Sequence, residues 1–137
     1  MPKTLKQPTA REYAEASALR EALRGFERRS DEITSSHGMT SRTYQLLLMI
    51  KTGEAGPERA GLPELEERLK LGKSTVTELV LRSERRGLVQ RELEPNSRGA
   101  ITIRLTLDGE RRLADALTAL GNERRRLLGI LSKLSAR

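Results

Sequence analysis

The segment 65–105 constrains the fold more than any other part of the chain. In order, it predicts a helix, a tight turn, a second helix that ends at Gly87, and two short strands joined by a turn. We expect the strands at 88–93 and 100–105, where apolar and polar residues partly alternate, with turn-forming residues at 94–99 between them. This order of elements is typical of a winged helix-turn-helix, in which the turn between the strands is the wing.

The second helix of the pair has two unlike faces. Val76, Leu79 and Val80 repeat at the spacing of a packed face, whereas small polar residues occupy the start of the helix. In a winged helix-turn-helix such a helix lies in a DNA major groove, and the wing lies beside it. We therefore interpret the following residues as candidate DNA contacts: Lys73, Ser74, Thr75, Thr77, Glu78, Arg82, and in the wing Asn96 and Arg98.

Helical patterns flank this unit on both sides. Thr9 and Glu12 form a capping-box pattern that predicts a helix over 9–35, with a narrow apolar stripe of the kind found between paired helices. A second helix follows Thr40, and the Gly-rich and charged segment 51–61 predicts a loop.

Leucines from Leu113 to Leu134 continue a helical pattern over 107–135, which Gly121 and Gly129 weaken enough to allow a bend or break. The fold class is therefore mainly α with a small β-hairpin wing. We expect a mobile tail at 1–8 and one domain at 9–137, with the winged helix-turn-helix at 40–106 and dimerisation helices at 9–35 and 107–135.

Composition agrees with a nucleic-acid partner and argues against catalysis. The chain of 137 residues has 26 Lys and Arg against 19 Asp and Glu, giving a net charge of +7. It has no Cys and a single His, His37, which we interpret as a loop or cap residue, so we expect no metal, no cofactor and no enzyme. Neither a signal peptide nor a membrane span of about 18 apolar residues is predicted, which favours a cytoplasmic protein.

The pattern from about Thr40 to Arg112 resembles the MarR family of bacterial transcription regulators. The strongest matches are KSTVT at 73–77 and the residues 84–89 that close the same helix. Further matches are Arg98 in the wing, then Arg104, Leu105 and Thr106 followed by Gly109. Together these motifs cover about half the chain in the order that the family has them.

The chain also departs from the family pattern at several positions. Lys70 stands at the usual turn glycine, Glu66 at a usual small residue and Ser83 at a usual core leucine. Ser97 replaces the Asp that normally precedes the wing arginine, and Glu78 occupies a position that is often basic or polar. The chain ends at Arg137, which we read as leaving little room for the sixth helix of many members.

The resemblance implies a homodimer that binds a pseudo-palindromic double-stranded operator and represses transcription until a small-molecule effector releases it. It also implies an effector cleft between the dimer helices and the winged-helix unit, for which Tyr44 is the aromatic candidate. Two alternatives remain open. One is a winged-helix protein-interaction module with weak or no DNA binding, which the acids Glu66, Glu67 and Glu78 favour, and the other is an architectural or RNA-binding winged helix.

Overall fold

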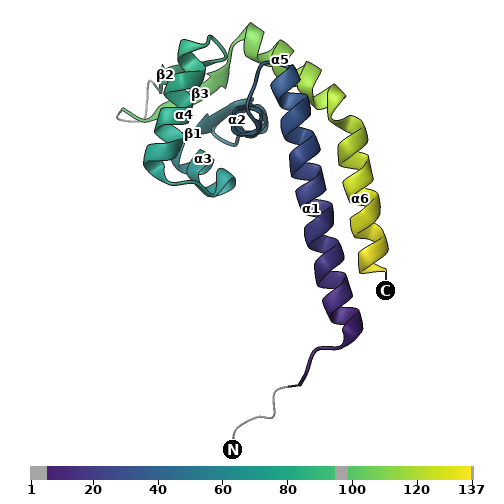
Figure 1. Cartoon of the computed structure of the whole chain (residues 1–137). Helices are drawn as coiled ribbons and strands as arrows, with labels where there is room; N and C mark the ends of the chain where they lie inside the picture. Colours follow the sequence, from purple (N-terminus) through teal and green to yellow (C-terminus); the bar gives the residue numbers. More distant parts are fainter. Residues whose placement is uncertain (1–5, 95–98, 137) are drawn as a thin grey trace, which may run out of the picture.

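The computed structural model describes residues 6–94 and 99–136, so most of the predicted tail lies outside the described residues. The described chain is mainly helical with one small sheet, as predicted (Figure 1). Its elements are, in order, α1 (Ala10–Ser36), α2 (Ser41–Lys51), β1 (Arg59–Gly61), α3 (Leu62–Leu69), α4 (Lys73–Arg85), β2 (Val89–Leu93), β3 (Ile101–Leu105), α5 (Leu107–Ala119) and α6 (Gly121–Ser135).

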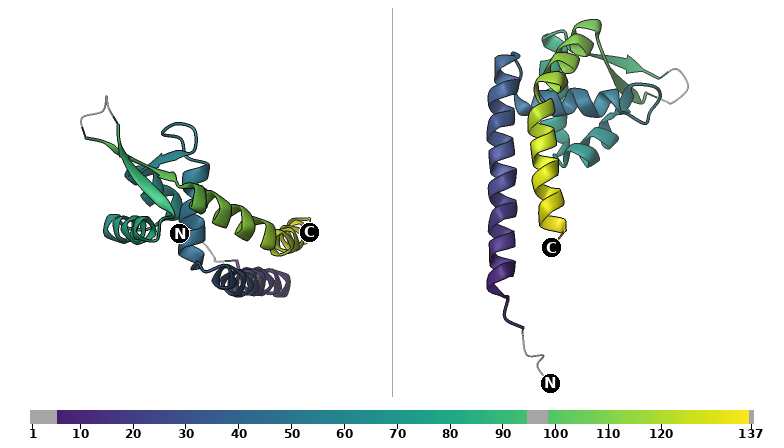
Figure 2. Two further views of the ribbon diagram at one scale, coloured as in Figure 1. Left: turned by 90° about the horizontal axis from the view of Figure 1, so that it is seen from above. Right: turned by 90° about the vertical axis from the view of Figure 1, so that its right-hand side faces the viewer.

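The molecule has two parts, which we call the body and the arm. The body consists of α2, α3, α4 and the sheet, and the arm consists of α1 and α6, which lie side by side and antiparallel (Figures 1 and 2). Helix α5 runs from the body to the arm. An ion pair between Arg29 Nε and Glu123 Oε2, 2.5 Å apart, joins the two helices of the arm.

Helix α2 lies at the centre of the body and contacts α3, α4, α5, β1 and β3. It begins at the cap residue Thr40, whose hydroxyl accepts a hydrogen bond from the Thr43 amide at 3.1 Å. Because it is covered on several sides, the helix needs apolar residues around most of its circumference. The body core consists mainly of large aliphatic side chains: Leu46, Leu47, Ile50, Leu65, Val76, Leu79, Val80, Leu88, Val89, Ile103 and Leu105.

The sheet has three antiparallel strands in the order β1-β3-β2. Strands β2 and β3 form the predicted hairpin, with Val89 opposite Leu105 and Leu93 opposite Ile101. The prediction of a loop throughout 51–61 is wrong at its end, because Arg59–Gly61 form β1 and pair with β3, Ala60 opposite Ile103. A three-residue strand with a single buried side chain has too little alternation for a sequence pattern to reveal it.

The turn between α3 and α4 is tight although it lacks the family glycine. Lys70 adopts the left-handed conformation there, with φ 57° and ψ 42°, and Leu71 donates its amide to the Glu66 carbonyl at 3.2 Å. Gly72 then caps α4. Lys70, in place of the usual glycine, therefore adds conformational strain to this turn but leaves the course of the backbone unchanged.

The C-terminal pattern forms two helices. The predicted break occurs at Leu120 and Gly121, while Gly129 lies inside α6 without a break. The expectation of little room for a sixth helix is therefore wrong, since α6 spans Gly121–Ser135. The helix runs back along α1 instead of continuing the direction of α5, so it needs no additional chain length (Figure 1).

Candidate nucleic-acid interface

Helix α4 presents one buried and one exposed face, as its sequence predicted. Val76, Leu79 and Val80 are buried in the body core. Ser83, at the usual core leucine, is also buried and donates its hydroxyl to the Leu79 carbonyl at 2.8 Å. The serine thereby satisfies its polar group within the helix, which makes its burial tolerable.

The predicted contact residues of α4 lie on its outer side. Lys73, Ser74, Thr75, Glu78 and Arg82 are exposed, whereas Thr77 is partly buried. The wing candidates Asn96 and Arg98 lie outside the described residues. The structure thus brings together five of the predicted side chains on one uncovered helix face, beside the hairpin that carries the wing (Figure 1).

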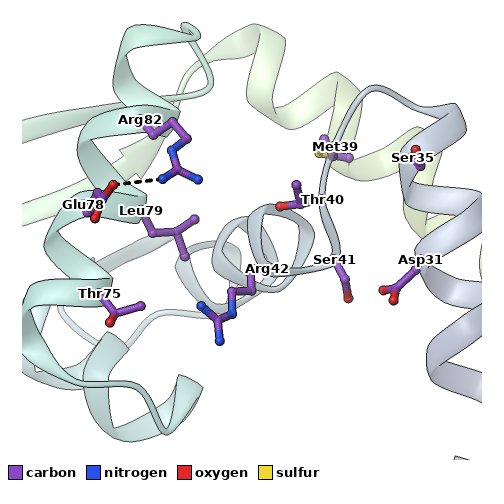
Figure 3. A pocket seen from close by; sticks show the side chains of 10 residues that line it. All are labelled: Asp31, Ser35, Met39, Thr40, Ser41, Arg42, Thr75, Glu78, Leu79 and Arg82. Carbon is purple, nitrogen blue, oxygen red and sulfur yellow. Dashed lines mark hydrogen bonds and ion pairs between the residues drawn. The ribbon is translucent and has the colours of Figure 1, made fainter. Parts of the chain in front are cut away.

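The exposed face of α4 is flanked by two hollows. One has a volume of about 700 Å³ and separates α4 from the start of α2 and the end of α1. Figure 3 shows Leu79 and Arg82 of α4 on one side of it, Asp31 and Ser35 of α1 on the other, and Arg42 of α2 between them. The second hollow, on the other side of α4, is lined by Lys73, Ser74, Thr77, Glu78, Leu81 and Arg85.

A joint of close backbone contacts fixes α4 relative to α5. Thr106 donates its hydroxyl to the Gly87 carbonyl at 2.5 Å and its amide to the Leu88 carbonyl at 3.1 Å. The same hydroxyl caps α5 by accepting from the Gly109 amide at 3.0 Å. A Cβ at Gly109 would lie 2.0 Å from the Leu88 carbonyl oxygen, so only glycine permits this approach.

Ion pairs compensate many of the basic side chains around α4. Arg82 pairs with Glu78 at 3.0 Å, and Arg91 of β2 pairs with Glu84 at 3.0 Å. Among the described residues, Lys73, Arg85 and Arg42 have no acidic partner. The uncompensated positive charge therefore lies at the start and end of α4 and at the start of α2.

A network of charged side chains covers the outer side of the sheet. The sequence did not predict it. Glu92 pairs with Arg104, and also with Arg59 at 3.3 Å. Arg59 reaches Glu94 at 3.7 Å, and Thr102 donates its hydroxyl to Glu94 at 3.0 Å. Arg59 belongs to strand β1, which no sequence pattern predicts, so its position beside the hairpin could not be predicted either. The period-two spacing of Glu92 and Glu94 is the one local signal, because it indicates a shared face.

The other residues singled out from the sequence lie away from this face. His37 caps the end of α1, as predicted. Tyr44 is half-buried against the body core and does not line the 700 Å³ hollow, so an effector role for it rests on the resemblance alone. Burial raises the pKa of the Tyr44 hydroxyl, an effect that the positive charge of Arg124 opposes.

Lys51 connects the end of α2 to two neighbouring segments. Its ammonium group lies 2.8 Å from Glu110 of α5 and 2.7 Å from Glu58, which precedes β1. The hydrogen bonds that the Lys51 ammonium group donates to Glu110 and Glu58 raise the pKa of Lys51, and the bond to Glu58 lowers the pKa of Glu58. The described residues contain no cluster of His, Cys, Asp and Glu suited to a metal ion, and none of their helices is long and apolar enough to cross a membrane.

Comparisons with known proteins identify solved structures that share this fold. No protein-family profile and no curated protein matches the sequence. AbsC, a MarR family transcriptional regulator from Streptomyces coelicolor, superposes with a TM-score of 0.79 at 20% identity, over 93% of this chain and 84% of that one. A second MarR family regulator from the same organism, solved in complex with DNA, gives 0.75 at 22% identity over 96% and 90%.

A third similar structure is CouR from Rhodococcus jostii, solved with bound p-coumaroyl-CoA. It superposes with a TM-score of 0.68 at 23% identity, over 79% of this chain and 73% of that one. The first two likenesses cover nearly the whole chain. The protein therefore has the fold of MarR family transcription regulators, and the fold implied by its sequence motifs is confirmed.

Proposed function

We propose that this chain is a sequence-specific DNA-binding transcription regulator that acts as a homodimer. The observation that carries the proposal is the uncovered face of α4, on which Lys73, Ser74, Thr75, Glu78 and Arg82 stand together beside the hairpin. Polar groups on an exposed helix next to a wing suit base-edge contact in a major groove, with unpaired cations at its margins for phosphates. A MarR family regulator with this fold has been solved in complex with DNA, which supports DNA as the partner.

Exposed apolar side chains of the arm support the proposal of a dimer. Leu19 of α1 and Leu128 of α6 are 38% and 60% exposed, and Tyr13 of α1 is 62% exposed, although all three side chains are largely apolar. A second copy of the chain that covers these side chains would remove them from water and place two α4 helices in successive major grooves. Such a dimer would bind a pseudo-palindrome with half-sites about 10 base pairs apart.

Repression released by a small-molecule effector is the form of regulation we favour. The hollow between α1, α2 and α4 touches both the arm and the candidate reading helix, so an occupant would affect the position of α4. The p-coumaroyl-CoA in the CouR structure shows that a regulator with this fold holds a small molecule. Phenolic acids are the first probes to test, measured by their ability to release DNA.

The proposal is tested by DNA binding at defined salt. The full chain is titrated against the intergenic DNA next to its own gene and against a scrambled duplex of the same length and composition, at 50 mM and 200 mM salt. We expect preferential binding of the intergenic duplex and a steep loss of affinity at the higher salt. Equal affinity for the two duplexes would support an architectural winged helix, and no binding to either would support the protein-interaction module, which the acidic compensation around α4 favours.

A further inference from the structure

Glu78 occupies the centre of the exposed face of α4. It lines both flanking hollows, which places it on the crest of the helix between them. Its side chain is 69% exposed. If α4 enters a major groove, the crest residue reaches deepest toward the bases, so the carboxylate must meet either a base edge or water trapped in the groove.

Arg82 holds this carboxylate from the next turn of the helix. Arg82 Nη2 donates to Glu78 Oε1 at 3.0 Å (Figure 3), and Glu78 Oε2 has no hydrogen-bond partner among the described residues. One carboxylate oxygen is therefore still free to accept, and the guanidinium has further N–H groups free to donate. The pair thus presents an acceptor and a set of donors next to each other on one helix face.

This arrangement is complementary to one particular base pair. A carboxylate among phosphates is unfavourable unless a cation compensates it and a donor meets it, and Arg82 supplies the cation. In the major groove, cytosine offers its N4 amino group as a donor, while the guanine paired with it offers the adjacent acceptors O6 and N7. Adenine also has an amino donor, but its acceptor N7 lies beside that donor and would repel the second oxygen of the carboxylate.

We propose that Glu78 and Arg82 together read one C·G base pair in each half-site. Glu78 accepts from N4 of cytosine, and Arg82 donates to O6 and N7 of the paired guanine. The inference rests on the proposed function, since it requires α4 to enter a major groove. It assigns to this chain a specificity that distinguishes it from winged helices with a basic or neutral residue at the crest.

The test is selection of binding sites from a pool of random-sequence duplexes by the full chain and four variants. We expect the natural chain to enrich a half-site with a C·G pair that it prefers about tenfold or more over the other pairs at that position. Glu78→Ala and Arg82→Ala should each reduce this preference at the same position. Because both side chains read one base pair, the double variant should lose little more than either single variant.

Glu32→Ala is the matched control, since Glu32 also forms an exposed pair with an arginine four residues away, Arg28, but lies on α1. It should select the same site as the natural chain. If Glu78→Ala strengthens binding to every duplex equally and leaves the selected site unchanged, the carboxylate reads no base and the inference is overturned. If the natural chain enriches no sequence, the proposed function fails and the inference fails with it.

Discussion

The body and the arm bury different kinds of side chain. In the body most of the fully buried residues are large and aliphatic, and Leu46, Leu47 and Ile50 of α2 have no exposed surface. In the arm, the buried residues of α1 are Ala22, Ser30 and Thr34, and that of α6 is Gly121. The hydroxyl oxygen of Ser30 is even buried without a hydrogen-bond partner in the part of the chain described.

This difference indicates where the stability of one subunit resides. Burying a large aliphatic side chain contributes about 1.5–3 kcal/mol relative to leaving it exposed. The body gains this many times over from a core that is closed within the monomer. The arm instead leaves leucines in water, so its stability depends on what covers it, which in our proposal is the second subunit.

The largest expected effect is the loss of a core side chain from the body. Leu47→Ala should lower the free energy of unfolding by about 2–5 kcal/mol, because it leaves a cavity in the centre of α2's packing. Leu128→Ala, at a 60% exposed position of the arm, should change it by less than about 1 kcal/mol when the chain is monomeric. Urea unfolding measures both, and equal losses would contradict the contrast between body and arm.

The contrast between a closely packed body and an open arm also applies to two glycines. Gly109→Ala should destabilise the chain by about 3 kcal/mol, because the new Cβ would lie 2.0 Å from the Leu88 carbonyl oxygen where α5 meets the body. Gly129→Ala in α6, where a Cβ meets nothing within 4 Å, should stabilise the helix by up to about 1 kcal/mol. Thermal unfolding of the two variants tests this, and a stable Gly109→Ala protein would refute the close approach at the joint.

The third prediction concerns assembly. Leu128→Glu places a charge on the apolar stripe of the arm and should weaken dimerisation about thirtyfold or more, while leaving the body folded. Sedimentation equilibrium reports the dissociation constant, and far-ultraviolet circular dichroism reports the helical content. Arg126→Glu, at an exposed position on another face of the same helix, is the control. A monomeric natural chain at micromolar concentration would exclude the proposed dimer.

The features of the fold that could be predicted from the sequence each depend on a local pattern. Thr9 and Glu12 form the predicted capping box, and the spacing of Val76, Leu79 and Val80 identified the buried face of α4. The hairpin was predicted because alternation and turn residues occur within a short segment. In each case the residues that decide the structure are close neighbours in the chain.

The features that could not be predicted depend on residues that lie far apart in the chain. Strand β1 is defined by its pairing with β3, more than 40 residues later, and the charge network around Arg59 follows from that pairing. The direction of α6 depends on its packing against α1. Within the candidate interface, sequence placed the side chains of α4 on one face but did not reveal that Glu78 and Arg82 are paired or that hollows flank them.

The smallest predicted effect lies at the turn between α3 and α4, inside the otherwise well-packed body. Lys70 has φ 57°, a conformation that an L residue with a Cβ adopts at a cost of about 1 kcal/mol and that glycine adopts freely. Lys70→Gly should therefore stabilise the chain by somewhat under this amount, since glycine also gains entropy in the unfolded state. The variant loses the exposed pair with Glu67, which contributes little.

Lys70→Ala separates the two effects, because it removes the same ion pair but keeps the Cβ. Urea unfolding should place Lys70→Gly above the natural chain and Lys70→Ala at or slightly below it. If both variants are destabilised equally, the ammonium group holds the turn and backbone strain is unimportant there. If Lys70→Gly alone is destabilised, the turn depends on the restricted backbone of lysine, and the body then contains a strained position that contributes to its stability.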